Sequence, residues 1–193
     1  MRWLVLAVIV ASAAPTPAGA EGLTGQLLVA TDVIGDPRFA HTVIYMIKDD
    51  DEGAMGFIVN RPVGTTSLAR IVESLGFESD GVEGDVRLHY GGPVEPAQGI
   101  VLHGSDYTGP GTKTLGDGVA ATTDPGIFAA MTQGRGPRHS LFTFGYAAWA
   151  PGQLADELKR DAWITVPADT LIIFDDDDDG KWSRAMARRK IQL

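Results

Sequence analysis

Apolar residues follow two different periods along this chain, and the two periods predict alternating strands and helices. Runs of β-branched and apolar residues predict strands over residues 26–30, 42–47, 55–59, 86–90, 99–103, 139–144, 163–166 and 171–174. Apolar residues that recur every three or four positions predict helices over residues 68–75, 124–132, 153–160 and 182–190. Because hairpins and helices both connect the strands, the pattern favours one mixed sheet over a regular parallel array.

Turn and cap residues set several of these boundaries. Ser67 is expected to cap the helix at residues 68–75, since a serine hydroxyl can accept from the free N–H groups of the first turn. Pro62 and Gly64 are expected to end the strand at residues 55–59. The Gly-Gly-Pro turn at residues 91–93 predicts a direct connection between strands 86–90 and 99–103. Residues 104–118, rich in Gly, Asp, Thr and Pro, predict a long loop or an irregular hairpin.

The first twenty residues have the pattern of a cleavable targeting segment. Arg2 precedes an apolar run over residues 3–14, and Ala18-Gly19-Ala20 supplies the small residues that a signal peptidase requires. The run is shorter than the about 20 apolar residues of a membrane-spanning helix. We therefore predict a signal peptide over residues 1–20, cleavage after Ala20, and a periplasmic or secreted protein without a transmembrane span. An uncleaved membrane anchor is the alternative.

Composition narrows the classes of function. The 193-residue chain has a formal net charge of −9 and no cysteine. Residues 21–193 suffice for one domain with a single core, and the absence of cysteine excludes thiol catalysis and cysteine-ligated metals. Negative charge repels phosphate backbones, so nucleic acid is not expected as a partner. Residues 109–114 lack the spacing of a phosphate loop, and no cofactor is predicted.

Besides the periodicity, specific residue motifs recur along nearly all of residues 21–193 and allow a comparison with known families. They include Gly25-x-Leu27-Leu28-Val29-Ala30-Thr31, Gly53-Ala54-Met55-Gly56-Phe57-Ile58-Val59-Asn60-Arg61-Pro62, Gly91-Gly92-Pro93-Val94 and Gly145-Tyr146-Ala147-x-Trp149-x-x-Gly152-Gln153-Leu154. In order and identity they resemble the AlgH/YqgE family of bacterial proteins.

This resemblance implies an α/β fold (α+β-like) in which a mixed, bifurcated sheet folds into a pseudo-barrel with helices packed outside. It implies little about function, because the family is largely uncharacterised and some members carry a transcriptional-regulator label. The chain departs from the family in two respects. Most members are cytoplasmic, whereas this chain carries a signal-peptide pattern. Many members have Cys and His near the end of the second strand, where this chain has Ile47 and Asp49.

Asn60-Arg61-Pro62, directly after a predicted strand, has two interpretations. Arginine can bind a carboxylate in a forked geometry, so the triplet could form an anion or peptide-carboxylate pocket, together with Gly91, Gly92 and His103. Alternatively, Asn60 and Arg61 clamp the end of the strand to a neighbouring loop by bonding backbone groups. The clamp is the favoured interpretation.

A catalytic interpretation depends on the histidines. His89 and His103 lie on strands predicted to be neighbours, and Ser105 and Asp106 follow His103. A hydrolase or a metal-assisted enzyme would need these side chains to converge within about 3 Å. A catalytic triad is assembled from distant parts of a fold, so the adjacent residues His103, Ser105 and Asp106 cannot form one by themselves. A hydrolase is therefore kept only as the alternative function, and no residue is assigned as catalytic.

Two charged segments follow at the C-terminal end. Asp175, Asp177 and Asp179 match three positions of a calcium loop, but Met186 occupies the position that requires a bidentate Glu, so only a looser calcium site remains as a hypothesis. Five adjacent carboxylates should stay solvated and extended. The basic residues Lys181, Arg184 and Arg188 share a helical face. That face could contact an anionic membrane surface weakly, or neutralise the protein's own acidic loops, which is favoured.

The sequence therefore favours a non-enzymatic exported binding module for a protein, a peptide or a small molecule. A hydrolase or metal-assisted enzyme is the alternative, and a transcriptional regulator is a further one. Negative charge and the predicted export argue against the regulator.

Overall fold

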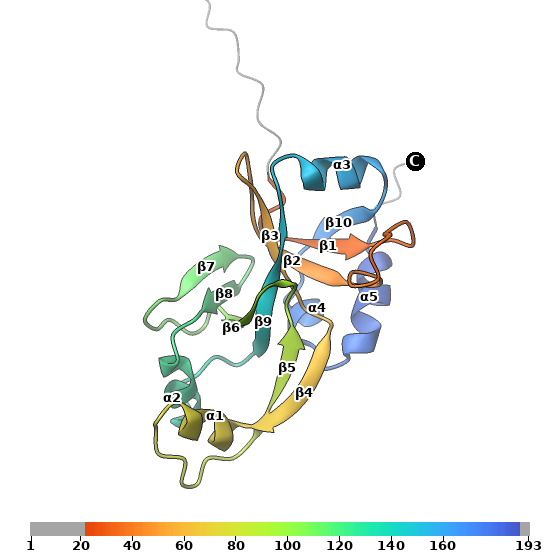
Figure 1. Cartoon of the computed structure of the whole chain (residues 1–193). Coiled ribbons are helices and arrows are strands. Elements are labelled where there is room, and N and C mark those ends of the chain that lie inside the picture. The colour runs from red at the N-terminus through yellow and green to blue at the C-terminus, as the bar shows by residue number, and fades with distance from the viewer. Residues whose placement is uncertain (1–21, 190–193) are drawn as a thin grey trace, which may run out of the picture.

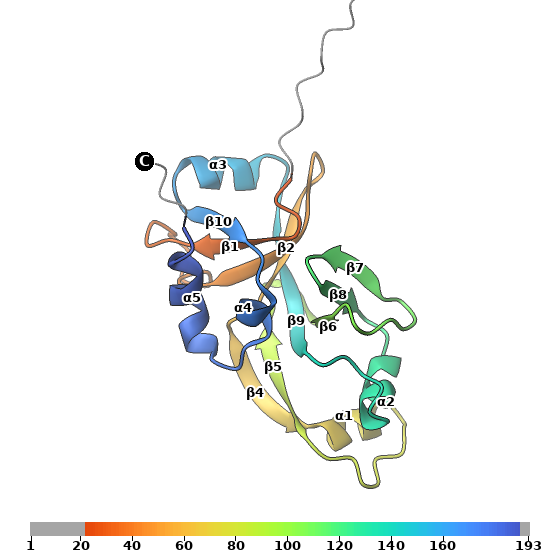
Figure 2. The ribbon, with the colours of Figure 1, turned by 180° about the vertical axis from the view of Figure 1, so that it is seen from behind.

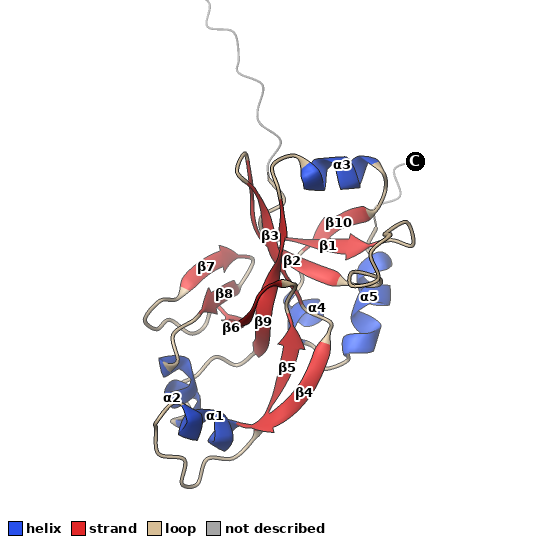
Figure 3. Cartoon of the chain, viewed as in Figure 1, coloured by secondary structure: helices blue, strands red, loops and turns tan. Residues whose placement is uncertain are grey.

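The computed structural model describes residues 22–189, so the predicted signal peptide and its cleavage site after Ala20 lie outside the described residues. Strands form the centre of the molecule and short helices lie around it (Figures 1 and 3). In chain order the elements are β1 (Gln26–Ala30), β2 (Val43–Asp50), β3 (Gly53–Ile58), β4 (Pro62–Ser67), α1 (Leu68–Ser74), β5 (Asp85–Tyr90), β6 (Val94–Gly104), β7 (Lys113–Gly116), β8 (Val119–Thr122), α2 (Gly126–Thr132), β9 (Ser140–Trp149), α3 (Gln153–Lys159), β10 (Trp163–Pro167), α4 (Thr170–Phe174) and α5 (Asp178–Met186).

The strands form one branched sheet in the order β10-β1-β2-β3-β9-β6-β8-β7, and β9 is the branch point. One edge of β9 pairs with β6, while the other pairs with β3 near its end and with β5 closer to its start. Among residues 22–189 the β5–β9 pair is parallel and all other strand pairs are antiparallel. The sheet curls into a half-barrel (Figures 1 and 2), which confirms the predicted fold class.

Strands β1 and β2 are buried on both faces, which explains their continuous apolar sequences. In β2, Val43 and Tyr45 enter one core cluster, whereas Ile44 and Met46 enter a second cluster on the opposite face. Alternating side chains of a strand point to opposite faces, so both faces must be covered. Helices supply the cover.

Three groups of helices cover three parts of the sheet. α4 and α5 pack on the first core cluster through Ile172, Ile173 and Ala185. In the view from behind, α5 lies beside β1 and β2 (Figure 2). α3 packs on the opposite face through Leu154, beside two edge-to-face tryptophans. α1 and α2 form a third cluster against β5, β6 and β9. The cap predicted at Ser67 is confirmed, because its Oγ accepts from Arg70 N at 3.3 Å.

Several predicted elements are wrong in detail. Residues 171–174 form helix α4 instead of a strand, because the Asp169 carboxylate accepts from Leu171 N at 2.7 Å and caps a helical turn. The last helix begins at Asp178, four residues before the predicted start. β3 ends before Pro62, as predicted, but Pro62 also begins the unpredicted strand β4, where proline is tolerated because β4 is an edge strand that pairs with β5.

Residues 91–93 connect β5 to β6, as predicted, but the expectation that the two strands are neighbours in the sheet is wrong. β9 lies between β5 and β6, and it pairs with both. For residues 104–118, a long loop or an irregular hairpin was predicted, and the structure contains part of a hairpin. β7 lies in this segment and pairs with β8, a strand that was not predicted. None of the helices in residues 22–189 is long and apolar enough to cross a membrane.

Candidate functional site

Asn60 and Arg61 bind the backbone of the loop that precedes β2. The Asn60 Oδ1 accepts from Val43 N at 2.9 Å, and its Nδ2 donates to the His41 carbonyl, also at 2.9 Å. The Arg61 Nη2 donates to the Ala40 carbonyl. Both side chains therefore bond backbone carbonyls or amides of residues 40–43, as the clamp interpretation requires.

Gly91 and Gly92 lie where β9 leaves no room for a side chain. A Cβ atom at Gly91 would lie 2.2 Å from the Gly145 carbonyl oxygen, and one at Gly92 would lie 2.1 Å from the carbonyl carbon of Tyr146. Gly92 also has a φ of +151°, which favours glycine. Both glycines are buried, so they allow residues 91–92 to pass close to the backbone of β9 and do not form a surface for a ligand.

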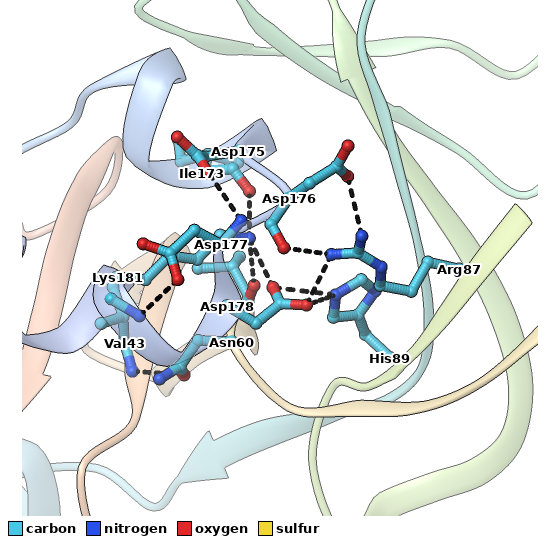
Figure 4. A network of polar contacts seen from close by, with 12 residues as sticks. Val43, Asn60, Arg87, His89, Ile173, Asp175, Asp176, Asp177, Asp178 and Lys181 are labelled. Atoms are coloured by element: carbon cyan, nitrogen blue, oxygen red, sulfur yellow. Dashed lines mark hydrogen bonds and ion pairs between the residues drawn. The ribbon is translucent and has the colours of Figure 1, made fainter.

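A buried cluster of charged side chains joins α5 to β5, and Asp178 lies at its centre (Figure 4). The Lys181 Nζ lies 2.9 Å from Asp178 Oδ1, and the Arg87 Nη1 lies 3.0 Å from Oδ2. The His89 Nε2 lies 3.2 Å from both carboxylate oxygens. Lys181 is fully buried, and its ammonium also donates to the carbonyls of Val59 and Ile173, at 2.8 and 3.0 Å.

The electrostatics of this cluster follow from burial and hydrogen bonding. Burial alone would raise the pKa of Asp178, but the hydrogen bonds from His89 and Lys181 outweigh it and hold this pKa well below the usual carboxyl range. Burial lowers the pKa of Lys181, against the opposing effect of its bond to Asp178. The carboxylate is therefore ionised at neutral pH, and the arrangement ties α5 to the sheet.

Two cavities adjoin this cluster. The first, which we call the His89 cavity, has a volume of about 310 Å³ and is lined by Thr65, Leu68, Gly84, Asp85, Val86, Arg87, His89, Met131, Ser140, Leu141, Phe142, Phe174, Asp175 and Asp176. The second, of about 300 Å³, is lined by Pro62, Gly64, Thr65, Arg87 and residues 176–179. Arg87 and Asp176 line both cavities, so the ion pair between them, at 3.3 Å, lies at their junction. Pro62, from the predicted triplet, lines the second of these cavities.

A third cavity, which we call the apolar cavity, lies between α1, α2 and the face of β5, β6 and β9. It has a volume of about 410 Å³, and its walls include Ile71, Leu75, Leu88, Val101, Phe128, Phe142 and Phe144. Phe128 and Phe142 stack with their ring centroids 5.2 Å apart. The polar residues in its lining are Thr66, Ser74, Thr122, Thr123, Asp124 and Thr143. The Thr122 hydroxyl donates to the Pro110 carbonyl, and the Asp124 carboxylate accepts from Gly126 N at 2.7 Å, at the start of α2. The Thr143 hydroxyl is buried and has no hydrogen-bond partner among the described residues.

The histidines proposed for catalysis do not meet. His103 is fully buried, and its Nδ1 lies 2.8 Å from the Gly104 carbonyl, whereas His89 contacts Asp178. β9 separates their strands, because His89 is opposite Thr143 and His103 is opposite Ser140. Asp106 instead pairs with Arg138, at 3.5 Å. The convergence that the hydrolase alternative requires is not formed.

The predictions for the two charged C-terminal segments require correction. Asp175 accepts from Asp177 N, and Asp177 caps α5 and binds Arg184 at 2.5 Å, so the aspartates are used in turn and cap contacts. Within residues 22–189, no three His, Asp or Glu side chains lie close enough together to hold a metal ion, so the looser calcium site is not formed. The run is not wholly solvated either, because Asp178 is buried.

Lys181 cannot contribute to a membrane-facing basic patch, because its side chain is buried against Asp178. Arg184 binds Asp177 and Arg188 binds Asp169. Both arginines therefore neutralise the protein's own carboxylates, in agreement with the favoured interpretation of this helix.

The sequence interpretation named His89 and Lys181 in other roles, and it missed Arg87 and the contacts of all three with Asp178. Arg87 and His89 lie two positions apart and therefore share a face of β5. Asp178 and Lys181, three positions apart, share a face of α5. Both spacings can be read from the sequence. The run of aspartates, however, gives no sign that the last helix begins at Asp178, and this helix start is what places Asp178 and Lys181 on the same face.

The curled half-barrel sheet and its covering helices define a mixed α/β protein, and comparisons with known proteins show its family. The chain belongs to the AlgH-like family, whose model matches residues 27–193. A UPF0301 protein of Methylococcus capsulatus is 40% identical over 177 residues, which cover 92% of this chain and 97% of the relative. A UPF0301 protein of Rhodospirillum rubrum is 43% identical over 166 residues, which cover 86% of each chain.

Solved structures agree with this assignment. The solution structure of the AlgH protein from Pseudomonas aeruginosa matches with a TM-score of 0.71 at 35% identity, and the match covers 92% of this chain and 94% of that one. A crystal structure of a protein from Corynebacterium diphtheriae matches with a TM-score of 0.67 at 19% identity, covers 87% of each chain, and supports the fold alone.

Proposed function

We propose that this chain is an exported, non-enzymatic binding module whose ligand is a small apolar molecule held in the apolar cavity. The observation that carries the proposal is the cavity itself. A volume of about 410 Å³ is within the range of about 300–1,000 Å³ that small-molecule sites occupy. Its walls are mostly aromatic and aliphatic, as in such sites.

Two of the polar residues that line the cavity already bond other parts of the protein, and the unpartnered hydroxyl of Thr143 could share one hydrogen bond with a ligand, an arrangement that favours binding over catalysis. Thr122 and Asp124 bond a neighbouring loop and the start of α2, so their side chains stabilise the cavity wall. An apolar ligand would gain free energy by leaving water for this wall, at roughly 25 cal/mol for each Å² buried. Leu75 is 40% exposed and lines the cavity, so apolar surface is accessible from outside.

The binding proposal can be tested with the neutral fluorescent probe N-phenyl-1-naphthylamine and a variant that blocks the cavity. Gly99 lies at the cavity wall and is exposed, and a Cβ atom there would lie 3.5 Å from a ring carbon of Phe144, an ordinary contact. Gly99→Leu should therefore fold and reduce the fluorescence gain of the bound probe. Gly35→Leu is the matched control, because Gly35 is exposed and a Cβ atom there would have no neighbour within 4 Å. Equal fluorescence from both variants would refute the site.

Export is a separate part of the proposal, and it is supported by the residue pattern over positions 1–20. The intact mass of the protein purified from its own cell envelope tests it. A chain that begins at Glu21 supports export, and a chain that begins at Met1 contradicts it. The same mass spectrum, recorded under native conditions, would reveal a co-purified apolar ligand by its added mass.

A further inference from the structure

A second site is suggested by the His89 cavity, which is separate from the apolar cavity in wall chemistry. His89 is only 4% exposed, and its Nδ1 has no hydrogen-bond partner among the described residues. Buried polar atoms are nearly always hydrogen-bonded, so an unpartnered one calls for an explanation. His89 forms part of the cavity wall, so an occupant of the cavity is a candidate partner.

The contact with Asp178 fixes what this nitrogen can do. Asp178 is ionised, and its carboxylate can only accept, so the Nε2 atom of His89 carries the proton that is shared with it. In the neutral ring the remaining nitrogen, Nδ1, then has a lone pair and accepts a hydrogen bond. An occupant of the His89 cavity must therefore donate an N–H or O–H group.

The charged residues around the cavity also indicate which kind of ligand it would bind. Three carboxylates line it, at Asp85, Asp175 and Asp176, and all three residues are exposed. The cation among the lining residues is Arg87, which already pairs with Asp176 and Asp178. Arg184, which does not line the cavity, lies 3.6 Å from Asp175, so Asp85 is the lining carboxylate without an ion pair among residues 22–189. The uncompensated charge is negative, so electrostatic complementarity favours a positively charged donor.

The remaining wall is apolar and can cover a hydrocarbon chain. Met131, Leu141, Phe142 and Phe174 line the same cavity. Alkylammonium groups combine a charged head with an apolar stem, and such stems pack along apolar surface while the head stays at the polar end. A volume of about 310 Å³ suits a short chain of this kind.

We propose that the His89 cavity binds a primary alkylammonium group, which donates an N–H to Nδ1 of His89, is balanced by Asp85 and Asp175, and packs its aliphatic stem against Phe142 and Phe174. Phe142 lines both cavities, but His89, Asp85 and Asp175 do not line the apolar cavity, so the site would stand if the function proposed above failed.

The probe for this site is n-pentylammonium, with 1-pentanol as the uncharged analogue and inorganic phosphate as the anion, all at constant ionic strength. The readout is the ¹⁵N chemical shift of His89 Nδ1 in histidine-labelled protein, which is tractable because the chain has four histidines. A saturable shift with n-pentylammonium, and a smaller or absent one with 1-pentanol, is expected. No shift with the amine, an equal shift with the alcohol, or a shift with phosphate instead would overturn the proposal.

A pair of matched variants separates the site from the general negative charge of the protein. Asp85→Asn with Asp175→Asn removes two charges at the cavity and keeps the Asp175 oxygen that accepts from Asp177 N. A charge pair about 4 Å apart in water is worth about a fivefold change in Kd, so this variant should bind the amine at least about fivefold more weakly. Asp51→Asn with Asp80→Asn removes two exposed charges elsewhere. An equal loss of affinity in both variants would refute the assignment.

Discussion

The buried ammonium of Lys181 allows a sharp test of how α5 is held to the sheet. Lys181→Met keeps most of the side-chain volume and removes the charge that contacts Asp178 and the carbonyls of Val59 and Ile173. Breaking a buried ion pair by removing one partner costs about 3–5 kcal/mol. An unsatisfied buried polar group costs about 1–3 kcal/mol.

The remaining contacts of the site decide where in these ranges the cost of Lys181→Met falls. Asp178 keeps Arg87 and His89 after the substitution, which places the ion-pair cost near the lower bound. The two carbonyls lose a donor, which adds to the cost. We therefore expect the free energy of unfolding to fall by about 4 kcal/mol, a large part of the roughly 5–15 kcal/mol that stabilises a typical domain.

Urea unfolding measures this change, and the chain supplies a matched control. Lys159 pairs with Asp156 at the same distance, 2.9 Å, and the same three-residue spacing, but the two side chains are 75% and 70% exposed. Lys159→Met should cost less than about 1 kcal/mol, because exposed pairs contribute little. If Lys181→Met lowered the unfolding free energy by no more than Lys159→Met, with the same urea dependence, the reasoning would be refuted.

The described contacts support three further predictions. The pKa of Asp178 is lower in the folded chain than in the unfolded one, so the ionised carboxylate stabilises the fold above the usual carboxyl pKa range, and this stabilisation is lost as pH falls through that range and below. The urea midpoint of the wild type should therefore fall more steeply on acidification than the urea midpoint of Asp178→Asn. Gly92→Ala should abolish folding in circular dichroism, because its Cβ would collide with backbone 2.1 Å away, whereas Gly76→Ala, with positive φ but open space, should cost only about 1 kcal/mol. Asn60→Ala should lower stability by about 1–2 kcal/mol and speed amide exchange at Val43, and unchanged exchange there would contradict the clamp.

The fold was predictable to the extent that local patterns specify it. The strands β1 and β2 follow from continuous apolar runs, and α1 follows from its period and the Ser67 cap. The run at residues 171–174 was ambiguous because so short a run does not separate a strand from a helix by period alone. The insertion of β9 between β5 and β6 is a long-range pairing that no local pattern encodes.

The site was less predictable, for a physical reason. A lysine that closely follows a run of aspartates is normally solvated, but Lys181 is buried where α5 packs on the chain around Val59 and Ile173. Arg87 and His89 bring donors to Asp178, and this contact offsets the free-energy cost of burying Asp178 and Lys181. The clamp at Asn60 was predictable because it uses the ordinary chemistry of a strand end, whereas the cavities depend on how distant elements pack.

The central position of β9 has a consequence for biosynthesis. A ribosome releases residues in order, so β3, β5 and β6 emerge before β9, the strand that joins them, and β1 emerges long before β10. Until then these strands have open edges, which can pair with other chains. Structures dominated by such distant pairings fold slowly. Local hairpins such as β2–β3 can pair early, but the complete sheet forms only when β9 and β10 have been made, so a nascent chain of this kind would benefit from holding chaperones until then.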